Sequence, residues 1–476
     1  MMEWIPTIGL EIHSQLATRT KIFCGCSTVF GGEPNSHSCP VCLGMPGVLP
    51  VLNRRAVELA MLMAFLTDGA IQQKSYFARK NYFYPDLPKG YQISMFEFPL
   101  IKGGHIDIDT GNGRRSIRIN RIHLEEDAGK LVHVEGDPES YFDVNRCGVP
   151  LIEIVTEPDF ENSEEVSQFL NILKEMLIFS GASRGNMEQG NIRVDANISI
   201  RPRGQKELNT RTEIKNMNSF VNAVAAINRE IDRQIGIVEG GGAVIQETLL
   251  YDAVRETLAS MRSKEEAHDY RYFPEPDLVP VFVDDAWIDR VRNELPEMRE
   301  DMRSRFGRDY RIPPYDVDIL TTAPDIARYF EETVGAGADP KKASNWIMGE
   351  VLRVLNETQG SLGEFKVEPA MLAELIKLVD SGSISGSIAK TVFDEMTLTG
   401  KNPGAIVEAK GLTQISDKSE LEKIVREVIE ASPDEVAKYR AGKTQVIGYF
   451  VGQVMKATGG KANPNEVNAL LREMLS

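Results

Sequence analysis

The amino-acid sequence predicts an α+β protein: a β-rich domain with antiparallel sheets, followed by a helical domain and a small helical tail. Polar and apolar residues alternate in the first part of the chain, whereas helical spacing of apolar residues dominates after about residue 290. The segment GKNPGAIVEAKG (400–411) then reads as a linker into the tail. These observations predict domains at residues 1–293, 294–405 and 406–476.

The clearest strand pattern is NIRVDANISI at 191–200. Its strict alternation predicts a strand in a sheet that has one buried and one polar side. The segment RTEIKN shows the same period and sets its charged side chains on one face. The polar faces carry Arg193, Asp195, Asn197 and Ser199 in the first segment, and Arg211, Glu213 and Lys215 in the second.

Helices are expected in both parts of the chain. One follows Ser163 and stops at Gly181, and another covers about 219–236. Further on, SNWIMGEVLRVLNE has Ser344 as its N-cap candidate, and PAMLAELIKLVDSG ends on a glycine, as many helices do. The apolar stripe of the former consists of Ile347, Met348, Val351, Leu352 and Leu355.

Length and composition are those of a folded multidomain protein. The chain has 476 residues, enough for roughly three domains, with 42% hydrophobic and 26% charged residues. No apolar run approaches the roughly 18 residues that span a membrane, and the start MMEWIPTIG lacks the basic and apolar regions of a signal peptide. We therefore expect a cytoplasmic protein with no membrane partner.

The formal net charge of -16 argues against nucleic-acid binding, because phosphate contacts require Lys and Arg. The window 438–461 is different, since it contains five basic residues and no Asp or Glu. Most charge runs are solvated surface, and contact with a polyanion is the alternative that a purely basic window in an acidic protein raises. The five residues are Lys438, Arg440, Lys443, Lys456 and Lys461.

Two candidate catalytic side chains lie in the segment TIGLEIHSQL. At period two, Glu11 and His13 point to the same side of this predicted strand, about 7 Å apart, so that both can touch one bound cation or its waters. The alternative is an ordinary solvated strand face.

A carboxylate cluster follows in IRINRIHLEEDAGK. The apolar residues change from odd to even positions, which predicts a β-bulge around Arg121. After the bulge Glu125 shares a face with His123 and Asp127, whereas Glu126 faces the other way. Adjacent carboxylates that point in opposite directions can have two different functions. The alternative is a charged turn after a strand.

A third carboxylate, Glu153, lies within the apolar run of GVPLIEIVTEPD. It is flanked by Leu151 and Val155 on its own face and by Ile152 and Ile154 on the other. A buried charge must be paired, hydrogen-bonded or bound to metal, because burying it alone costs several kcal/mol. An ion pair with an Arg is the alternative to a functional role.

The segment ARKNYFYPDLPKGYQIS mixes Arg79, Lys80 and Lys89 with four aromatic residues. Cations beside aromatic faces suit phosphate and nucleotide binding, although a tyrosine-rich core strand with solvated lysines has the same composition. Together with the carboxylates, these groups suit Mg²⁺ and nucleotide phosphates. The segment AKYRAGKT is no P-loop, because Ala437 stands where the first glycine belongs.

Four of the five cysteines lie within 24–42, with the spacing C-x-C-x12-C-x2-C. Two short knuckles of thiolates predict a structural zinc site, and four protein ligands leave no open position for catalysis. The predicted zinc ligands are Cys24, Cys26, Cys39 and Cys42. The fifth cysteine, Cys147, is expected to be an ordinary packed thiol.

Several motifs together resemble the B subunits (GatB) of the tRNA-dependent aspartyl/glutamyl amidotransferases. They are TIGLEIH, RKNYFYPDLPKGYQIS, HLEEDAGK, DVNRCGVPLIEIVTEPD, DANIS, EIKNMNSF, DYRYFPEPDL, SNWIMGE and ANPNEVNALLREML. The resemblance covers about residues 6 to 474, with the motifs in the family's order. It implies a β-rich cradle, a helical domain and a helical tail that grips tRNA.

The resemblance also implies a reaction. Such subunits use Mg-ATP to phosphorylate the side-chain carboxylate of Glu-tRNA(Gln) or Asp-tRNA(Asn), and ammonia then replaces the phosphate. A partner amidase, the A subunit, releases the ammonia from glutamine, and a small C subunit clasps the other two. Two alternatives remain: a zinc-containing tRNA-binding scaffold without chemistry, and a stand-alone ATP-dependent ligase. The chain contains no glutaminase nucleophile motif, which favours a partner as the ammonia source.

Residue roles follow from the same resemblance. The Mg-ATP site would be lined by Glu11, His13, Glu125 and Glu153, with Lys80 assisting at the phosphate or the activated carboxylate. The mouth of the ammonia tunnel would carry Lys89 and Glu126. The basic window 438–461 lies in the part that corresponds to the tRNA-binding tail. Only some family members carry the four cysteines, so that zinc is not part of the chemistry.

Overall fold

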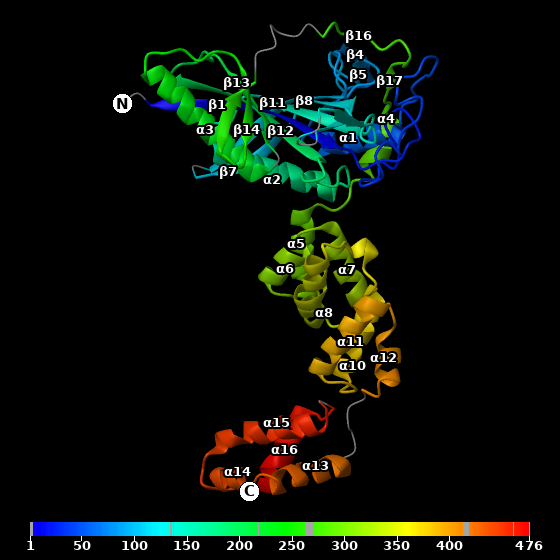
Figure 1. The fold of residues 1–476 in the computed structure, drawn as a ribbon, viewed down its shortest axis with the longest axis vertical. Coiled ribbons are helices and arrows are strands. Elements are labelled where there is room, and N and C mark those ends of the chain that lie inside the picture. The colour runs from blue at the N-terminus through cyan, green and yellow to red at the C-terminus, as the bar shows by residue number, and fades with distance from the viewer. Residues whose placement is uncertain are drawn as a thin grey trace. The chain divides into compact units, whose positions relative to one another are not determined.

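The computed structural model describes residues 3–111, 113–133, 136, 138–217, 219–261, 270–412, 418–459 and 461–475. Asn218 and Asp269, which belong to the motifs EIKNMNSF and DYRYFPEPDL, lie outside the described residues. The chain divides into two compact units, Met1–Met298 and Arg299–Ser476. Figure 1 shows strands in the first unit and helices throughout the second, which confirms the predicted α+β class.

Within the described residues, one sheet of thirteen strands dominates the first unit, and its main path runs β15-β14-β13-β12-β1-β11-β8-β5-β4-β16. Neighbouring strands are antiparallel, as predicted, except β13 and β14. The strands of this sheet are β1 (Trp4–Gln15), β2 (Ala70–Ile71), β4 (Ala78–Asn81), β5 (Tyr91–Ser94), β6 (Ile101–Lys102), β7 (His105–Thr110), β8 (Gly113–Glu126), β11 (Pro150–Thr156), β12 (Ile192–Pro202), β13 (Thr212–Met217), β14 (Thr248–Asp252), β15 (Thr257–Ser260) and β16 (Phe273–Pro274).

Two strand pairs stand beside this sheet. They are β9 (Lys130–His133) with β10 (Ser140–Asp143), and β3 (Lys74–Ser75) with β17 (Val281–Phe282). The first unit also contains the helices α1 (Arg54–Leu66), α2 (Ser163–Phe179), α3 (Phe220–Glu239) and α4 (Asp285–Arg292).

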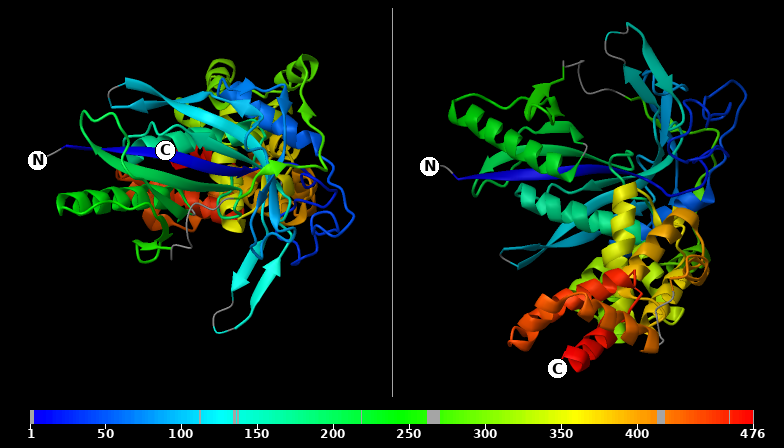
Figure 2. Two further views of the ribbon diagram at one scale, coloured as in Figure 1. Left: turned by 90° about the horizontal axis from the view of Figure 1, so that it is seen from above. Right: turned by 60° about the horizontal axis from the view of Figure 1, so that its bottom comes forward.

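The apolar faces of the central strands and helices α1 to α3 form one hydrophobic core. Strand β1 runs through the middle of the sheet, between β12 and β11 (Figure 2). Its Ile8, Leu10 and Ile12 are fully buried in that core, as the alternation predicted. Because successive side chains of a strand point to opposite faces, Glu11 and His13 are left on the other face of the sheet.

Two local predictions for this unit are confirmed. Strand β8 contains the expected bulge: Val155 pairs with Arg121 and Thr156 with Ile119, so that Asn120 is the extra residue. The predicted helices are also present. The side chain of Asn162 caps α2 by accepting a hydrogen bond from the Glu165 amide at 2.9 Å.

The second unit is helical. Its elements are α5 (Arg299–Tyr310), α6 (Pro314–Leu320), α7 (Pro324–Gly335), α8 (Pro340–Trp346), the π-helical segment η1 (Ile347–Val351), α9 (Leu352–Thr358), the 3₁₀ segment η2 (Leu362–Glu364), α10 (Pro369–Asp380), α11 (Gly386–Thr399), α12 (Pro403–Ala409), α13 (Lys418–Glu430), α14 (Pro433–Arg440), the 3₁₀ segment η3 (Thr444–Val446), α15 (Ile447–Ala457) and α16 (Pro464–Leu475). In the part of the chain that is described, no helix is both long enough and apolar enough to cross a bilayer.

The N-cap predicted at Ser344 is wrong. Helix α8 begins after Asp339, whose side chain accepts a hydrogen bond from the Lys342 amide at 3.0 Å. Ser344 is buried inside the helix and donates its hydroxyl hydrogen bond to Asp316. A serine can cap a helix or satisfy a buried carboxylate, and only the packed structure distinguishes the two.

The linker predicted at 400–411 is also wrong, because α12 occupies most of it and buries Ile406 and Val407. Pro403 is the first residue of this helix, a position that proline favours. The predicted boundary between 405 and 406 therefore falls inside a helix, whereas the one between 293 and 294 falls between α4 and α5. Helices α13, α15 and α16 share a small core of their own, which includes Leu421, Phe450 and Leu471.

Candidate functional site

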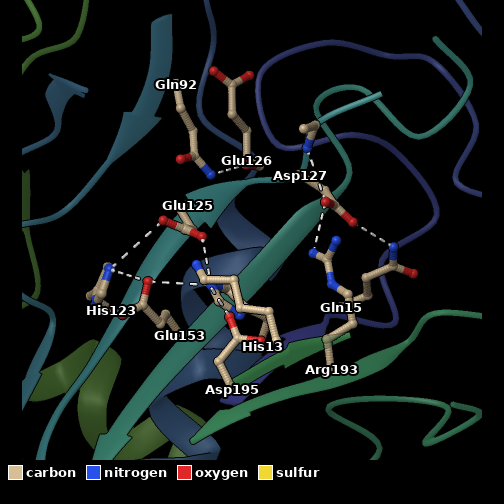
Figure 3. Close-up of polar contacts among 12 residues, drawn as sticks. His13, Gln15, Gln92, His123, Glu125, Glu126, Asp127, Glu153, Arg193 and Asp195 are labelled. Carbon is tan, nitrogen blue, oxygen red and sulfur yellow. Dashed lines mark hydrogen bonds and ion pairs between the residues drawn. The ribbon is translucent and has the colours of Figure 1, made fainter. Parts of the chain in front are cut away.

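Three neighbouring strands bring the predicted acidic and imidazole side chains together. His13 of β1 lies opposite Glu153 of β11, and Glu153 lies opposite His123 of β8. Glu125 follows two residues after His123, on the same face of β8 (Figure 3). The row forms because β11 lies between β1 and β8 and its register aligns these positions.

The functional groups of these residues surround a common point. The Nε2 atom of His13 lies 3.4 Å from a carboxylate oxygen of Glu153 and 3.6 Å from one of Glu125. The candidate ligand atoms of His13, Glu125 and Glu153, here called the carboxylate cluster, all lie within 4.8 Å of one another. These separations exceed an ordinary hydrogen bond of about 2.9 Å but suit ligands that share one divalent cation or its waters.

The two carboxyl groups of the cluster have opposite pKa shifts. Burial, reinforced by the charge of Glu153, raises the pKa of Glu125 to about 7. Burial alone would also raise the pKa of Glu153, but the neighbouring His123 and His13, both charged at the low pH where this carboxyl group titrates, hold it below its usual range. Two close carboxylates cannot both ionise cheaply, so one keeps its charge while the other stays near its titration point at neutral pH.

The two histidines also differ. Burial would lower the pKa of His13, but its contact with Glu153 and the charges of Glu125 and Glu153 raise the pKa. Burial lowers the pKa of His123 to about 4, so that this imidazole is neutral. Its Nε2 lies 3.6 Å from Glu153 and 3.8 Å from Glu125, and its buried Nδ1 has no hydrogen-bond partner among the described residues. The alternation predicts the face on which His123 lies but indicates no role for it.

Glu11 lies on the same face but outside the carboxylate cluster. In the register of β1 and β12 it is opposite Asp195, and the Asn197 amide donates a hydrogen bond to it at 3.1 Å. Burial, followed by the charges of Glu153, Glu213 and Asp195, raises the pKa of Glu11. The ammonium group of Lys215 partly offsets these charges, because it lies 3.1 Å from Glu213 and 3.8 Å from Asp195.

Strand β12 supplies site residues that the sequence did not assign. Arg193 lies opposite His13 and donates a hydrogen bond of 2.8 Å to Asp127, which also accepts one of 2.7 Å from Gln15. Asp127 is buried and engaged in these bonds, so it fixes the end of β8 against β1 and β12 (Figure 3). The alternation at 191–200 predicted the polar face with Arg193 and Asp195, but not its pairing with β1.

Lys80 stands beside the cluster on β4. Its Nζ atom lies 4.9 Å from the centre of the Tyr270 ring and 5.9 Å from that of Tyr82. Its charge helps to lower the pKa of Glu153 and to limit the rise at Glu125. Among the described residues, this ammonium group forms no hydrogen bond or ion pair, and it can therefore receive a phosphate or carboxylate of a ligand.

Glu126 points away from Glu125, as its place in the alternation predicted (Figure 3). Its carboxylate receives the Lys89 ammonium and the Ile93 amide, the latter at 2.8 Å. Both charged side chains are largely buried and line a cavity of about 90 Å³. The cavity is also lined by Lys21, Cys24, Cys42 and Gly44.

The four predicted zinc ligands meet in one place. The sulfur atoms of Cys24, Cys26, Cys39 and Cys42, here called the cysteine cluster, lie within 4.8 Å of one another, and no disulfide joins them. The Cys39 and Cys42 sulfurs are 3.9 Å apart, close to the separation of about 3.8 Å in a tetrahedral site with Zn–S bonds of about 2.3 Å. A hydrogen bond with Cys24 is the main cause that lowers the pKa of Cys42 to about 4. This donor set fits zinc.

The remaining predicted residues lie elsewhere. Cys147 is buried, burial raises its pKa to about 12, and its thiol donates to the Asp86 carbonyl at 3.4 Å, as expected for a packed thiol. In the second unit, Lys461 is half-buried and Lys438 forms an ion pair of 3.0 Å with Glu435. The other three basic residues of the window are exposed: Arg440, Lys443 and Lys456.

Comparison with known proteins assigns the chain to a family. The profile of the GatB/GatE catalytic domain matches residues 6–289, and that of the GatB domain matches residues 328–475. The B subunits of the aspartyl/glutamyl-tRNA(Asn/Gln) amidotransferases from Geobacter sp. (strain M21), Solidesulfovibrio magneticus and Chlorobium phaeobacteroides are each 53% identical to it, with 100% of both chains covered. The chain therefore belongs to the GatB family, the B subunits of the tRNA-dependent amidotransferases.

Proposed function

We propose that this protein carries out the ATP-dependent step that converts Glu-tRNA(Gln), Asp-tRNA(Asn) or both into the amidated aminoacyl-tRNA. The observation that carries the proposal is the carboxylate cluster, in which His13, Glu125 and Glu153 converge on one point of a sheet face. Two carboxylates and an imidazole, beside a lysine that forms no ion pair among the described residues, suit a magnesium nucleotide, because carboxylate oxygens bind Mg²⁺ and an ammonium group binds phosphate. Because the substrate is an aminoacyl-tRNA, we place the reaction in the cytoplasm.

In this proposal Glu125, Glu153 and His13 would hold the cation, with Glu11 on the same face of the sheet beside them. When bound there, Mg²⁺ would supply positive charge to neutralise the charge that develops on the phosphate. Lys80 binds the transferred phosphate or the substrate carboxylate through its unpaired ammonium group. The neutral His123 packs beside both carboxylates of the cluster, with its Nε2 atom 3.6 Å from Glu153 and 3.8 Å from Glu125.

The reaction then needs two displacements. An oxygen of the substrate carboxylate attacks the γ-phosphorus of ATP, the bond to the bridging oxygen breaks, and ADP leaves. Ammonia attacks the carbon of the resulting acyl phosphate, the bond to the phosphate oxygen breaks, and inorganic phosphate leaves with the proton that the nitrogen loses. Phosphorylation is required because an oxide is a poor leaving group, whereas phosphate is a good one.

The ammonia must come from outside this chain. The relatives are named as B subunits, which implies partner subunits, and we propose a glutamine-hydrolysing amidase and a small third subunit that clasps the two. Lys89 and Glu126 would stand at the point where ammonia enters, on the side of β8 opposite to Glu125. A zinc ion in the cysteine cluster would hold the local loop without taking part in the reaction.

The basic window is the proposed contact with the tRNA backbone. Arg440, Lys443 and Lys456 are exposed, which is the state that phosphate contacts require. Replacing Lys443 and Lys456 by Glu should weaken tRNA binding and reduce the dependence of log Kd on log salt by about 2, or somewhat less, if each lysine neutralises one phosphate. Binding titrations at several salt concentrations measure both quantities, and an unchanged affinity with an unchanged slope would exclude this contact.

The activity itself is tested by ATP hydrolysis in the assembled complex, with and without Glu-tRNA(Gln). The wild-type complex should hydrolyse ATP faster when the tRNA is present, and Glu153→Ala should remove this stimulation. Glu164→Ala is the matched control, because Glu164 is an exposed carboxylate in the first turn of α2. Equal and tRNA-independent rates in wild type and Glu153→Ala would support a scaffold that has no chemistry of its own.

A further inference from the structure

Lys21 is the most unusual buried side chain of the first unit. It lies between β1 and the cysteine cluster and has an exposed fraction of 0%. Lysine is almost never fully buried unless its charge is compensated. No carboxylate of the described residues forms an ion pair with it. Its counter-charge must therefore come from another kind of group.

The ammonium group of Lys21 has three acceptors, one for each of its hydrogens. They are the carbonyl oxygen of His37 at 2.7 Å, the carbonyl oxygen of Val144 at 3.2 Å and the sulfur of Cys42 at 3.6 Å. Two of these acceptors belong to the loop that carries the cysteines, and the third belongs to the turn before β11. The lysine thus joins two segments that lie far apart in the sequence.

The cysteine cluster supplies the missing negative charge. Four thiolates around one Zn²⁺ carry a net charge of -2, which is costly to hold at a site that is partly shielded from water. We propose that Lys21 is the positioning residue of this metal site: its ammonium group compensates the charge of the zinc-loaded cysteine cluster and holds the cluster against the cavity of Lys89 and Glu126.

Two glycines allow the loop of the cysteine cluster to approach that cavity closely. A Cβ atom on Gly148 would lie 3.6 Å from Lys21, 3.7 Å from Cys42 and 3.9 Å from the Glu126 carboxylate, so these three side chains meet at its bare backbone. A Cβ atom on Gly44 would lie 2.2 Å from Cγ of Lys89. The loop of the cysteine cluster therefore packs directly on the Lys89–Glu126 pair, and Cys24, Cys42 and Lys21 are part of the same cavity wall.

Zinc retention tests the electrostatic part of this proposal. Lys21→Met keeps the length of the side chain and removes its charge, and Lys102→Met is the control, because Lys102 is exposed on β6. We expect a chromogenic chelator to remove zinc from full-length Lys21→Met about tenfold faster than from the wild type, the size of effect usual for groups that support metal ligands. Equal release rates in a folded Lys21→Met protein would overturn the proposal.

A double-mutant cycle protects the test against a general folding defect. In the wild-type background, Lys21→Met should lower the melting temperature of the zinc-loaded protein. In the Cys39→Ser background, which lacks one of the four ligands, the same change should have little effect or raise the melting temperature, because a buried ammonium without thiolate charge is unfavourable. An equal decrease in both backgrounds would show that Lys21 acts only through its hydrogen bonds to the two carbonyl groups, and would overturn the proposal.

The proposal that Lys21 holds the cysteine cluster against the cavity rests on the proposed function, since it assumes that ammonia passes Lys89 and Glu126. The assembled complex should form less amidated tRNA per glutamine hydrolysed when it carries Lys21→Met, whereas added ammonium chloride should restore its rate to that of the Lys102→Met control. An unchanged ratio would overturn this part. If the wild-type complex forms no amide even with ATP and ammonium chloride, the proposed function fails, and the zinc measurements still decide the role of Lys21.

Discussion

The carboxylate cluster and the cysteine cluster are both groups of metal ligands, yet they are built in different ways. The first uses regular strands, and its members come from three chain segments that meet only through the register of the sheet. The second uses one loop and a short stretch of sequence. Two carboxylates with separated pKa values and an imidazole suit a labile magnesium nucleotide, whereas four thiolates suit a closed structural ion.

The two clusters obtain their rigidity from different sources. Strands β1, β8 and β11 already fix the side chains of the carboxylate cluster. A metal ion is therefore not needed to hold them, and it can bind and leave together with a substrate. The loop of the cysteine cluster has little regular structure between Thr20 and Asn53, so a metal there would supply the order that the backbone lacks. Removing ligands from each cluster should therefore have opposite consequences for activity and stability.

The largest effect should come from Glu125→Gln. This change keeps the shape of the side chain but removes a charge from the carboxylate cluster, and we expect ATP-dependent amide formation by the complex to fall about 1,000-fold, or about 4 kcal/mol in activation free energy. Zinc content should stay at the wild-type value, and the melting temperature should not fall. Glu164→Gln serves as the control. A loss below tenfold would mean that Glu125 is not part of the reaction centre.

The next effect should come from Cys39→Ser, which should show the reverse pattern. We expect the bound zinc to be lost and the free energy of unfolding of the first unit to fall by about 3 kcal/mol, because loss of a structural metal is among the most destabilising changes. The rate of amide formation with ammonium chloride should fall by less than tenfold. Metal analysis and thermal unfolding measure the first two quantities. Full stability without zinc would remove the distinction between the clusters.

The smallest effect concerns pH. Because the pKa of Glu125 is raised to about 7, its carboxyl group holds a proton at pH 6 and has lost it at pH 8. A cation must displace that proton, so Mg²⁺ affinity should rise about tenfold between these pH values. Titration calorimetry can measure this, and Glu125→Gln should remove most of the dependence. A wild-type affinity that falls as pH rises would contradict the assignment of Glu125 as the titrating ligand.

The raised pKa of Glu125 also affects the stability of the fold. Its contribution to stability falls as pH rises, whereas the Mg²⁺ affinity increases. The folded protein binds a proton at Glu125 more tightly than the unfolded chain, whose carboxyl group titrates near 4.5. The contribution of this proton is fully present below about pH 4.5 and is lost as pH rises through about 7. Metal binding is therefore strongest under the conditions in which this group stabilises the metal-free fold least.

Much of the site could be predicted because a strand has a period of two. Glu11 and His13 were expected on one face, Glu125 and Glu126 on opposite faces, and Glu153 at a position where its charge needs a partner, and the structure places all five accordingly. The bulge next to Arg121 could be predicted because the apolar residues change from odd to even positions there. The cysteine cluster was equally accessible, because its ligands lie close in sequence.

Other features were missed because local sequence does not determine them. Ser344 has the chemistry of an N-cap but satisfies Asp316 inside the second unit. The segment 400–411 has the composition of a linker but folds as α12, because Ile406 and Val407 find a core to pack against. His123, Asp195 and Lys21 gained a role only through neighbours that are distant in the chain.

The sequence by itself determined which side chains share a face of each strand, which cysteines can hold one metal ion, and, through its motifs, the family. Only the tertiary structure decided that β1 lies between β12 and β11, with His13 opposite Glu153 and Arg193. The physical reason is that alternation is a property of the backbone of each strand, whereas the order and register of strands depend on burial and pairing summed over the whole sheet. The carboxylate cluster therefore forms only when the strands have paired in this order and register.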